Sequence, residues 1–183
     1  MSKSGVDLDS VGAYVNMVKE NEGFANVTFR ANSTWKKGTR ADVSIKQFFA
    51  NGEPASRPDR NFTVQTDEPP QLGGADTFAN PAELLAASLC GCLTAGIATN
   101  AALFETDLQD LNVQVELNWD MKGVLGLDRS VPNGPLSIHY VVEMKGDSEE
   151  KLKKAKEVID KKSPVLNSLL NQMKITSEFK LIK

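Results

Sequence analysis

The chain has few of the residues on which disulfide, metal and cofactor chemistry depends. Its 183 residues include two cysteines and one histidine. Cys90 and Cys92 stand too close together in the chain to link distant segments, so a disulfide framework is excluded and a reducing, cytoplasmic setting is expected. On a helix their side chains point to nearly opposite sides, which leaves no ligand set for a metal ion. We therefore expect no metal site and no cofactor.

The chain also lacks a strong excess of charge, and its beginning lacks the apolar segment of a signal peptide. A net charge of -3 argues against nucleic acid as the main partner. From Leu84 to Phe104 there is no charged residue, and a run of this length can span a bilayer. The run is rich in Ala, Gly, Ser and Thr, however, so we predict the central helix of a core and no membrane partner.

The hydrophobic pattern predicts an α+β fold without internal repeats or linkers. The length suits a single domain over residues 1–183, with residues 1–22 as an N-terminal helical extension. Residues 67–76 contain prolines and glycines that indicate a loop. Alternating or β-rich segments predict strands at residues 24–35, 40–49, 61–66, 111–122, 136–145 and 174–182.

Three helices begin with recognisable capping residues. Asn80 is a strong N-cap residue, Pro81 suits the first helical position, and Glu83 stands where a capping box places a carboxylate. Asp147 and Glu150 predict a second capping box, and Ser163-Pro164 predicts another helix start. The sequence therefore predicts a central helix that begins at residue 81 and carries both cysteines.

Several other residues have simpler interpretations than a catalytic one. His139 lies in an alternating strand, which favours a structural histidine. Gly73-Gly74 lacks the lysine and the strand–helix context of a phosphate loop, so it predicts a turn. No residue near Ser163 in the sequence is an evident general base for it, so we predict that Ser163 is an N-cap rather than a nucleophile. We also hypothesise that Asp67 and Glu68 order their loop against a partner subunit.

Four segments of the chain together resemble one known family. They are the loop Asp67-Glu68-Pro69 through Gly73-Gly74-Ala75-Asp76, the helix start Asn80-Pro81-Ala82-Glu83-Leu84-Leu85, the mid-helix Gly91-Cys92, and Lys162-Ser163-Pro164-Val165. This combination resembles the OsmC/Ohr family. The resemblance implies an intertwined homodimer in which two sheets wrap paired central helices. It also implies reduction of organic hydroperoxides by a peroxidatic cysteine, a resolving cysteine, an Arg and a Glu, with a dithiol reductant.

The resemblance assigns roles to only some of these positions. Cys92 falls on the peroxidatic position, and Lys162-Ser163 stands where the resolving cysteine is expected. The activating Glu would lie ten positions before Cys92, where this chain has Ala82, and the neighbouring Glu83 also has a capping role. Arg40 is the best candidate for the activating Arg, with Arg30 as the alternative.

These residues leave two main hypotheses for the function. In the first, Cys92 reduces organic hydroperoxides and is oxidised to a sulfenic acid, which an external thiol then resolves. Cys90 cannot resolve it, because it lies two residues away on the same helix and its side chain points to nearly the opposite side. In the second, the fold binds a small apolar or thiol-bearing metabolite at the dimer interface without a redox cycle. A third interpretation makes both cysteines core residues of an interaction protein.

Overall fold

The computed structural model describes residues 4–181, which group into two compact units. Asp7–Ala87 form the first unit, and residues 4–6 together with residues 88–181 form the second. Both units combine helices with antiparallel strands, so the predicted α+β class is confirmed. The prediction of a single domain, with residues 1–22 as an extension, stays a prediction.

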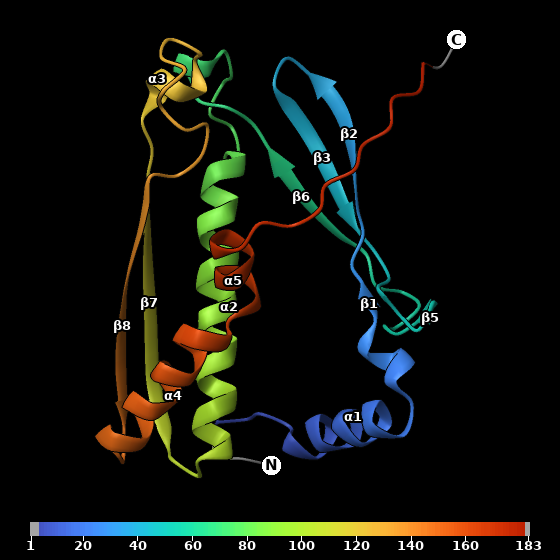
Figure 1. Cartoon of the computed structure of the whole chain (residues 1–183), viewed down its shortest axis with the longest axis vertical. Helices are drawn as coiled ribbons and strands as arrows, with labels where there is room; N and C mark the ends of the chain where they lie inside the picture. The colour runs from blue at the N-terminus through green and yellow to red at the C-terminus, as the bar shows by residue number, and fades with distance from the viewer. Residues whose placement is uncertain (1–3, 182–183) are drawn as a thin grey trace. The chain divides into compact units, whose positions relative to one another are not determined.

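The first unit consists of an N-terminal helix and two small sheets (Figure 1). Helix α1 (Leu8–Glu20) is capped by Asp7, whose carboxylate accepts a hydrogen bond from the Ser10 N–H, and it leads into the 3-10 helix η1 (Glu22–Ala25). One sheet has the order β1-β4-β5 and the other β2-β3-β6. The strands are β1 (Val27–Thr28), β2 (Ala31–Lys37), β3 (Arg40–Ile45), β4 (Phe49–Ala50), β5 (Glu53–Pro54) and β6 (Phe62–Thr66).

The strands predicted at residues 24–35 and 40–49 are each divided between the two sheets. Thr28 pairs with Phe49 in one sheet, and Ala31 pairs with Ile45 in the other. Two residues therefore face three at the junction, which interrupts the ladder of hydrogen bonds. The prediction of continuous strands was wrong here because an alternating pattern does not say which sheet each half joins.

The second unit is organised around helix α2 (Pro81–Leu103), which begins in the first unit. Strands β7 (Leu108–Asn118) and β8 (Ser137–Gly146) pair as an antiparallel hairpin beside it, as Figure 1 shows. Along both strands half-buried and exposed side chains alternate, because successive residues point to opposite faces of the hairpin. The apolar face packs on α2, α4 (Glu149–Lys162) and α5 (Pro164–Leu170).

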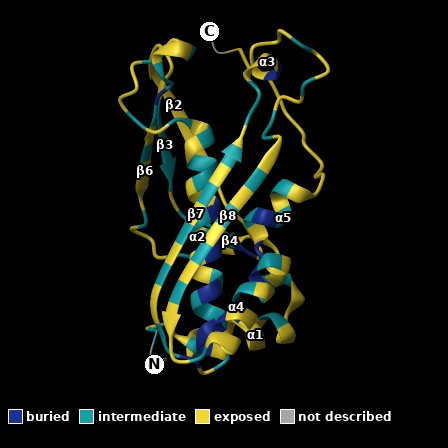
Figure 2. Cartoon of the chain, turned by 90° about the vertical axis from the view of Figure 1, so that its left-hand side faces the viewer, coloured by how far each residue is buried: buried dark blue, intermediate teal, exposed yellow. Residues whose placement is uncertain are grey.

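Part of α2 is buried, as the dark blue bands on its ribbon show (Figure 2). Leu89, Leu93 and Ile97, four residues apart, are fully buried and form one hydrophobic cluster with Ile159 of α4 and Leu166 of α5. Residues at this spacing lie one above the other on a helix, so they enter the core together. Further along the helix, the fully buried Ala101 packs with Leu152 and Ala155. Helix α2 is also long and apolar enough to cross a membrane, a test that the core helices of other proteins pass as well.

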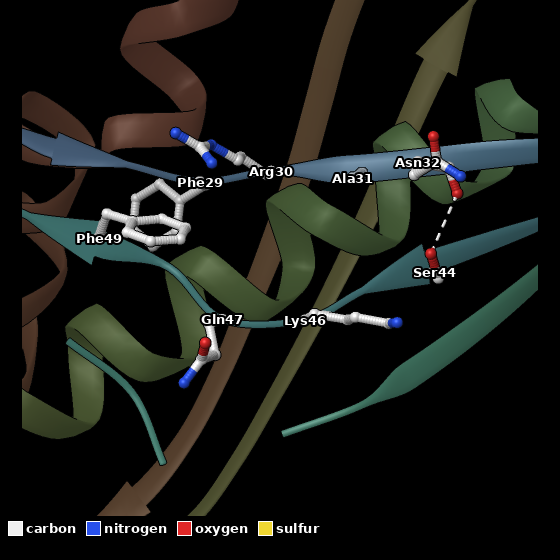
Figure 3. Close-up of a pocket in the computed structure, with 8 residues that line it drawn as sticks. All are labelled: Phe29, Arg30, Ala31, Asn32, Ser44, Lys46, Gln47 and Phe49. Atoms are coloured by element: carbon white, nitrogen blue, oxygen red, sulfur yellow. Dashed lines mark hydrogen bonds between the residues drawn. The ribbon is translucent and has the colours of Figure 1, made fainter. Parts of the chain in front are cut away.

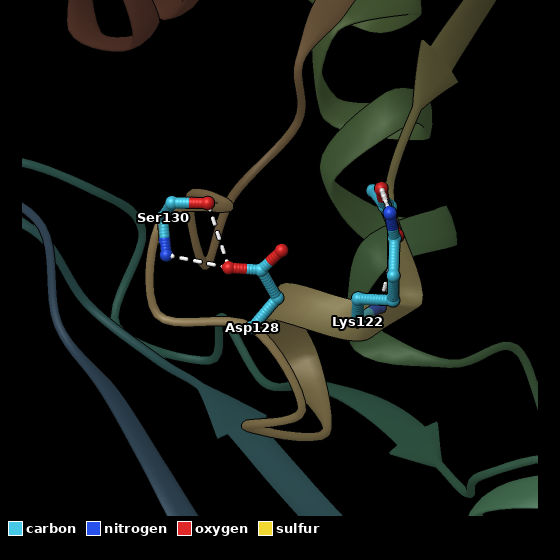
Figure 4. Close-up of polar contacts among 4 residues, drawn as sticks. Lys122, Asp128 and Ser130 are labelled. Carbon is cyan, nitrogen blue, oxygen red and sulfur yellow. Dashed lines mark hydrogen bonds and ion pairs between the residues drawn. The ribbon is translucent and has the colours of Figure 1, made fainter.

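The connection between β7 and β8 contains the short helix α3 (Met121–Val124) and a turn held by side chains. The Asp128 carboxylate accepts hydrogen bonds from the backbone N–H of Ser130 at 2.9 Å and from its hydroxyl at 2.6 Å (Figure 4). The Ser130 hydroxyl, followed by the Ser130 N–H, lowers the pKa of Asp128 below its ordinary value. This end of the hairpin is therefore ordered by local polar contacts.

Two predictions near the C-terminus were wrong. Ser148, not Asp147, is the N-cap of α4, because Asp147 instead accepts hydrogen bonds from the Thr106 hydroxyl and the Asp107 N–H. The strand predicted at residues 174–182 is absent from residues 174–181, and Ile182 lies outside the described residues. A strand is stable only when it is paired, and the alternation of apolar residues in this segment does not supply a pairing strand.

Candidate functional site

Cys92 lies in the middle of α2 and is half-buried, so its sulfur is packed but not sealed from solvent. It precedes the fully buried Leu93. Its Sγ lies 3.2 Å from the Oγ of Ser163, which is 71 residues later in the chain. Among the described residues of the second unit, this is the one polar contact of the Cys92 sulfur. The structure therefore brings together the two positions that the family resemblance linked.

Ser163 is fully buried at the start of α5. Its Oγ accepts a hydrogen bond from the Leu166 N–H at 3.2 Å, which confirms its predicted role as an N-cap. Pro164 occupies the first helical position, where its missing N–H costs no hydrogen bond. The cap fixes the serine side chain, and its oxygen also reaches the Cys92 sulfur. Sequence reasoning identified the cap and missed this second contact.

Cys90 is also half-buried and has a free thiol. It precedes Cys92 by two residues on α2, a spacing that rotates the side chain by about 200° around a helix. The two thiols therefore point to nearly opposite sides of α2, and an intact helix keeps them from forming a disulfide.

Glu83 takes the capping role predicted for it. Its carboxylate accepts a hydrogen bond from the Asn80 N–H at 2.8 Å, and the Asn80 side chain accepts one from the Glu83 N–H at 2.9 Å. This reciprocal pair is a complete capping box. A second role for Glu83, as the activating carboxylate, stays a prediction.

Arg40 begins β3 in the first unit, directly after the β2–β3 turn. Its guanidinium lies over the Phe78 ring, 5.1 Å from the ring centre. Arg40 lines a cavity of about 320 Å³ together with Asp67, Gly73 and Gly74. An exposed arginine held on an aromatic ring in a cavity is suited to attract an anionic group. Its predicted proximity to Cys92 stays a prediction, because Cys92 belongs to the second unit.

The neighbouring loop at residues 67–77 is held together by one buried carboxylate. Asp67 is 1% exposed and accepts five hydrogen bonds. The donors are the Thr39 and Thr77 hydroxyls and the N–H groups of Glu68, Ala75 and Thr77. These bonds, chiefly that from the Thr39 hydroxyl, keep the pKa of Asp67 well below its ordinary value despite burial.

This carboxylate fixes the position of Arg40 as well as the loop. Thr39 immediately precedes Arg40, and its hydroxyl donates to Asp67 at 2.7 Å. Gly74 is required here because a Cβ atom would overlap the backbone of Glu68. The hypothesis that Asp67 orders the loop against a partner subunit is not needed to explain its burial, since its five bonds lie within its own chain.

Arg30, the alternative arginine, lies at a different hollow of the first unit. Its guanidinium lies 4.3 Å from the centre of the Phe49 ring. The hollow measures about 620 Å³ and is lined by Phe29, Arg30, Ala31, Asn32, Ser44, Lys46, Gln47 and Phe49 (Figure 3). The two candidate arginines therefore lie at separate hollows. Of the two, only Arg40 follows a residue, Thr39, that is hydrogen-bonded to Asp67.

A second polar cluster lies on the β8–α4 side of the core. The Tyr140 hydroxyl donates to Asp160 at 2.7 Å, and Lys156 forms an ion pair with the same carboxylate at 2.8 Å. Burial, followed by the hydrogen bond to Asp160, raises the pKa of Tyr140 to about 12. His139 is exposed next to it and faces Glu116 across the hairpin. Within residues 4–181 no group of three or more potential ligands is placed to hold a metal ion.

Comparison with known protein families gives a match that covers the central helix and its cysteine. The sequence model of the OsmC-like proteins matches residues 73–178, which is more than half of the chain. The chain belongs to the OsmC-like family. The match includes α2 with Cys92 and the start of α5 with Ser163. A search of curated proteins found no match.

Solved structures with this fold come from several bacteria. An osmotic stress and detoxification response protein of Psychrobacter arcticus is 19% identical, with a TM-score of 0.56 over 75% of this chain and 85% of that one. An organic hydroperoxide resistance protein of Legionella pneumophila is 19% identical, with a TM-score of 0.50 over 78% and 88%. An OsmC-like protein of unknown function from Vibrio cholerae is 14% identical, with a TM-score of 0.51 over 77% and 92%. These identities establish the shared fold alone.

Proposed function

We propose that this OsmC-like protein reduces organic hydroperoxides through Cys92 and an external thiol. The observation that carries the proposal is the 3.2 Å contact between the Cys92 sulfur and Ser163. It joins the mid-helix cysteine to the helix start at which a second sulfur acts in the peroxidases that the chain resembles. Membership of the family and the half-buried state of Cys92 support a reactive rather than an inert thiol.

The cycle uses one cysteine of the protein. The Cys92 thiolate attacks the hydroperoxide, so an S–O bond forms, the O–O bond breaks, and the alcohol leaves with a proton from water. The resulting sulfenic acid then reacts with an external thiol, which releases water and forms a mixed disulfide. A second external thiol regenerates Cys92. Neither Cys90, on another side of α2, nor the hydroxyl of Ser163 replaces the external sulfur.

Within this proposal Arg40 is the activating arginine and Glu83 is the candidate for the activating carboxylate. Arg40 supplies positive charge that favours the thiolate, and the anchored turn at Thr39 holds it in place. We expect Arg40→Ala to slow oxidation of Cys92 more than Arg30→Ala does, because Arg30 lies at a separate hollow. Equal effects of the two changes would remove Arg40 from the mechanism.

A second copy of the chain completes the proposed functional form. Gly91, Thr94 and Ala95 are exposed on α2, and a Cβ atom added to Gly91 would have no other described heavy atom within 4 Å outside its own helix turn. A largely apolar helix with a bare face of small residues is suited to close packing against another helix. We expect sedimentation at micromolar concentration to show a homodimer, and Ala95→Arg to shift it towards monomer. A monomeric parent protein would contradict this part of the proposal.

The experiment that tests the reaction is intact-mass spectrometry of the reduced protein after brief exposure to cumene hydroperoxide. Parallel samples carry Cys92→Ser and Cys90→Ser. Addition of one oxygen to the parent and to Cys90→Ser, but not to Cys92→Ser, is the expected result at stoichiometric peroxide. An unmodified parent protein would support the second function instead, in which the fold binds a small apolar or thiol-bearing metabolite. The serine at position 163, in place of a second cysteine, is the feature that favours that alternative.

A further inference from the structure

We propose that the Ser163 hydroxyl positions and supports the reactive form of the Cys92 sulfur by donating a hydrogen bond to its thiolate. Ser163 thus has a role of its own in the chemistry and is more than a replacement for a missing cysteine. This inference rests on the proposed hydroperoxide reduction and adds to it a residue that acts through Cys92.

The direction of the hydrogen bond follows from the number of protons available. A serine hydroxyl has one proton and two lone pairs. The Leu166 N–H donates to the Ser163 oxygen, which uses a lone pair and leaves the hydroxyl proton free. A thiolate carries no proton. In the thiolate state the contact of 3.2 Å therefore has Ser163 as its donor and Cys92 as its acceptor.

The surroundings make this donor important. Ser163 is fully buried, so water does not compete for its hydroxyl proton. Among the described residues of the second unit, no lysine or arginine forms a hydrogen bond with the Cys92 sulfur. A hydrogen bond to an ionised acceptor is stronger than one between neutral groups, and an apolar environment strengthens it further. Loss of the hydroxyl is expected to remove this hydrogen bond from the thiolate and to slow the reactions of Cys92.

The first measurement is the rate of alkylation of Cys92 by iodoacetamide at pH 7, which does not depend on peroxide chemistry. A Cys90→Ser background leaves Cys92 as the one thiol of the chain. We expect Ser163→Ala to slow alkylation by about tenfold, the size expected for one hydrogen bond to a charged group. Ser163→Thr keeps the hydroxyl and is expected to retain most of the rate.

Ser168→Ala is the matched control for this measurement. It removes a hydroxyl from the same helix, where Ser168 donates to the Pro164 carbonyl, whereas the hydrogen bond with Cys92 is made by Ser163. We expect Ser168→Ala to leave the alkylation rate unchanged. An alkylation rate in Ser163→Ala equal to that of the parent would overturn the inference, as would a loss of rate in Ser163→Thr as large as in Ser163→Ala.

A second variant tests the geometry even if Ser163→Ala does not fold. In the Cys90→Ser background, Ser163→Cys places a second thiol where the oxygen now lies 3.2 Å from the Cys92 sulfur. Treatment with an aromatic disulfide reagent is expected to label one thiol and then expel the label, leaving a disulfide between residues 92 and 163 and a protein lighter by two hydrogen atoms. Two retained labels would refute the contact on which the inference rests.

Cumene hydroperoxide in place of the aromatic reagent separates the two proposals. If Cys92 reacts with peroxide, its sulfenic acid condenses with the thiol at position 163, water leaves and the same disulfide forms. A disulfide formed with the aromatic reagent but not with the hydroperoxide would leave the Ser163 contact intact and refute the proposed reaction. Disulfide formation with both reagents supports the contact and the reaction together.

Discussion

Gly96 on α2 offers a direct test of how closely α2 and α4 pack. A Cβ atom added at this position would overlap the Cδ1 and Cγ1 atoms of Ile159. Ile159 is buried in the core, so its side chain has little free space into which to move. Gly96→Ala therefore inserts a methyl group where another side chain already lies.

The expected magnitude is the balance of two opposing effects. Overpacking a core by one methyl group costs about 1–3 kcal/mol. Replacing glycine by alanine inside a helix gains about 1 kcal/mol. We therefore expect Gly96→Ala to lower the free energy of unfolding by up to about 2 kcal/mol. Ile159→Ala removes both Cδ1 and Cγ1 and by itself costs about 2–5 kcal/mol.

Combining the two changes tests the packing argument. In the double variant with Ile159→Ala, the methyl group at position 96 takes space that Cδ1 and Cγ1 occupied, so this variant should be at least as stable as Ile159→Ala alone. Urea unfolding of the parent, both single variants and the double variant measures the coupling, which we expect to be about 1–2 kcal/mol. Gly12→Ala on α1 is the control, because a Cβ atom there meets nothing, and it should not destabilise the protein. Additivity of the two single changes within about 0.5 kcal/mol would refute the reasoning.

Three further predictions concern polar groups. Asn80→Ala removes the N-cap of α2 and should lower the free energy of unfolding by about 1 kcal/mol in urea titrations, and an unchanged value would contradict the capping role. Because Asp67 has a lowered pKa when folded, its stabilisation is present above pH 3.8 and is lost as the pH falls through the lower folded value. Asp67→Asn should thus lower the melting temperature at pH 7 and flatten its dependence on acid pH; the same acid dependence in both proteins would exclude Asp67 as the source. Tyr140 should ionise near pH 12 in an absorbance titration, so its stabilisation is lost as the pH rises from about 10 to about 12; a midpoint in Asp160→Asn that is no lower would contradict the role of Asp160.

Helix starts were predictable because their determinants are local. Asn80 and Glu83 cap groups within three residues of themselves, and the structure confirms the reciprocal pair. The same holds for Ser163 at the start of α5. Strands β7 and β8 were also predictable, since their alternating side chains keep one apolar face over ten or more residues.

The two errors near the C-terminus have the opposite cause, since each depended on distant partners. The alternation at residues 174–181 looks like a strand, but no strand pairs with that segment in the described residues. Asp147 looks like a cap, but it binds Thr106 and Asp107, about forty residues earlier in the chain. The short strand β5 was missed although Asn51-Gly52, both with positive φ, is a typical hairpin turn.

The sequence by itself determined the available chemistry of the candidate site. It places two thiols on one helix and a carboxylate within a glycine- and proline-rich loop, and it has no cysteine at the start of α5. Only the tertiary structure decided which of these groups meet. Ser163 reaches Cys92 across 71 residues because Leu166, three residues after Ser163, belongs to the same buried cluster as Leu89 and Leu93. Such a contact arises from the burial of apolar side chains distant in sequence, which no local pattern encodes.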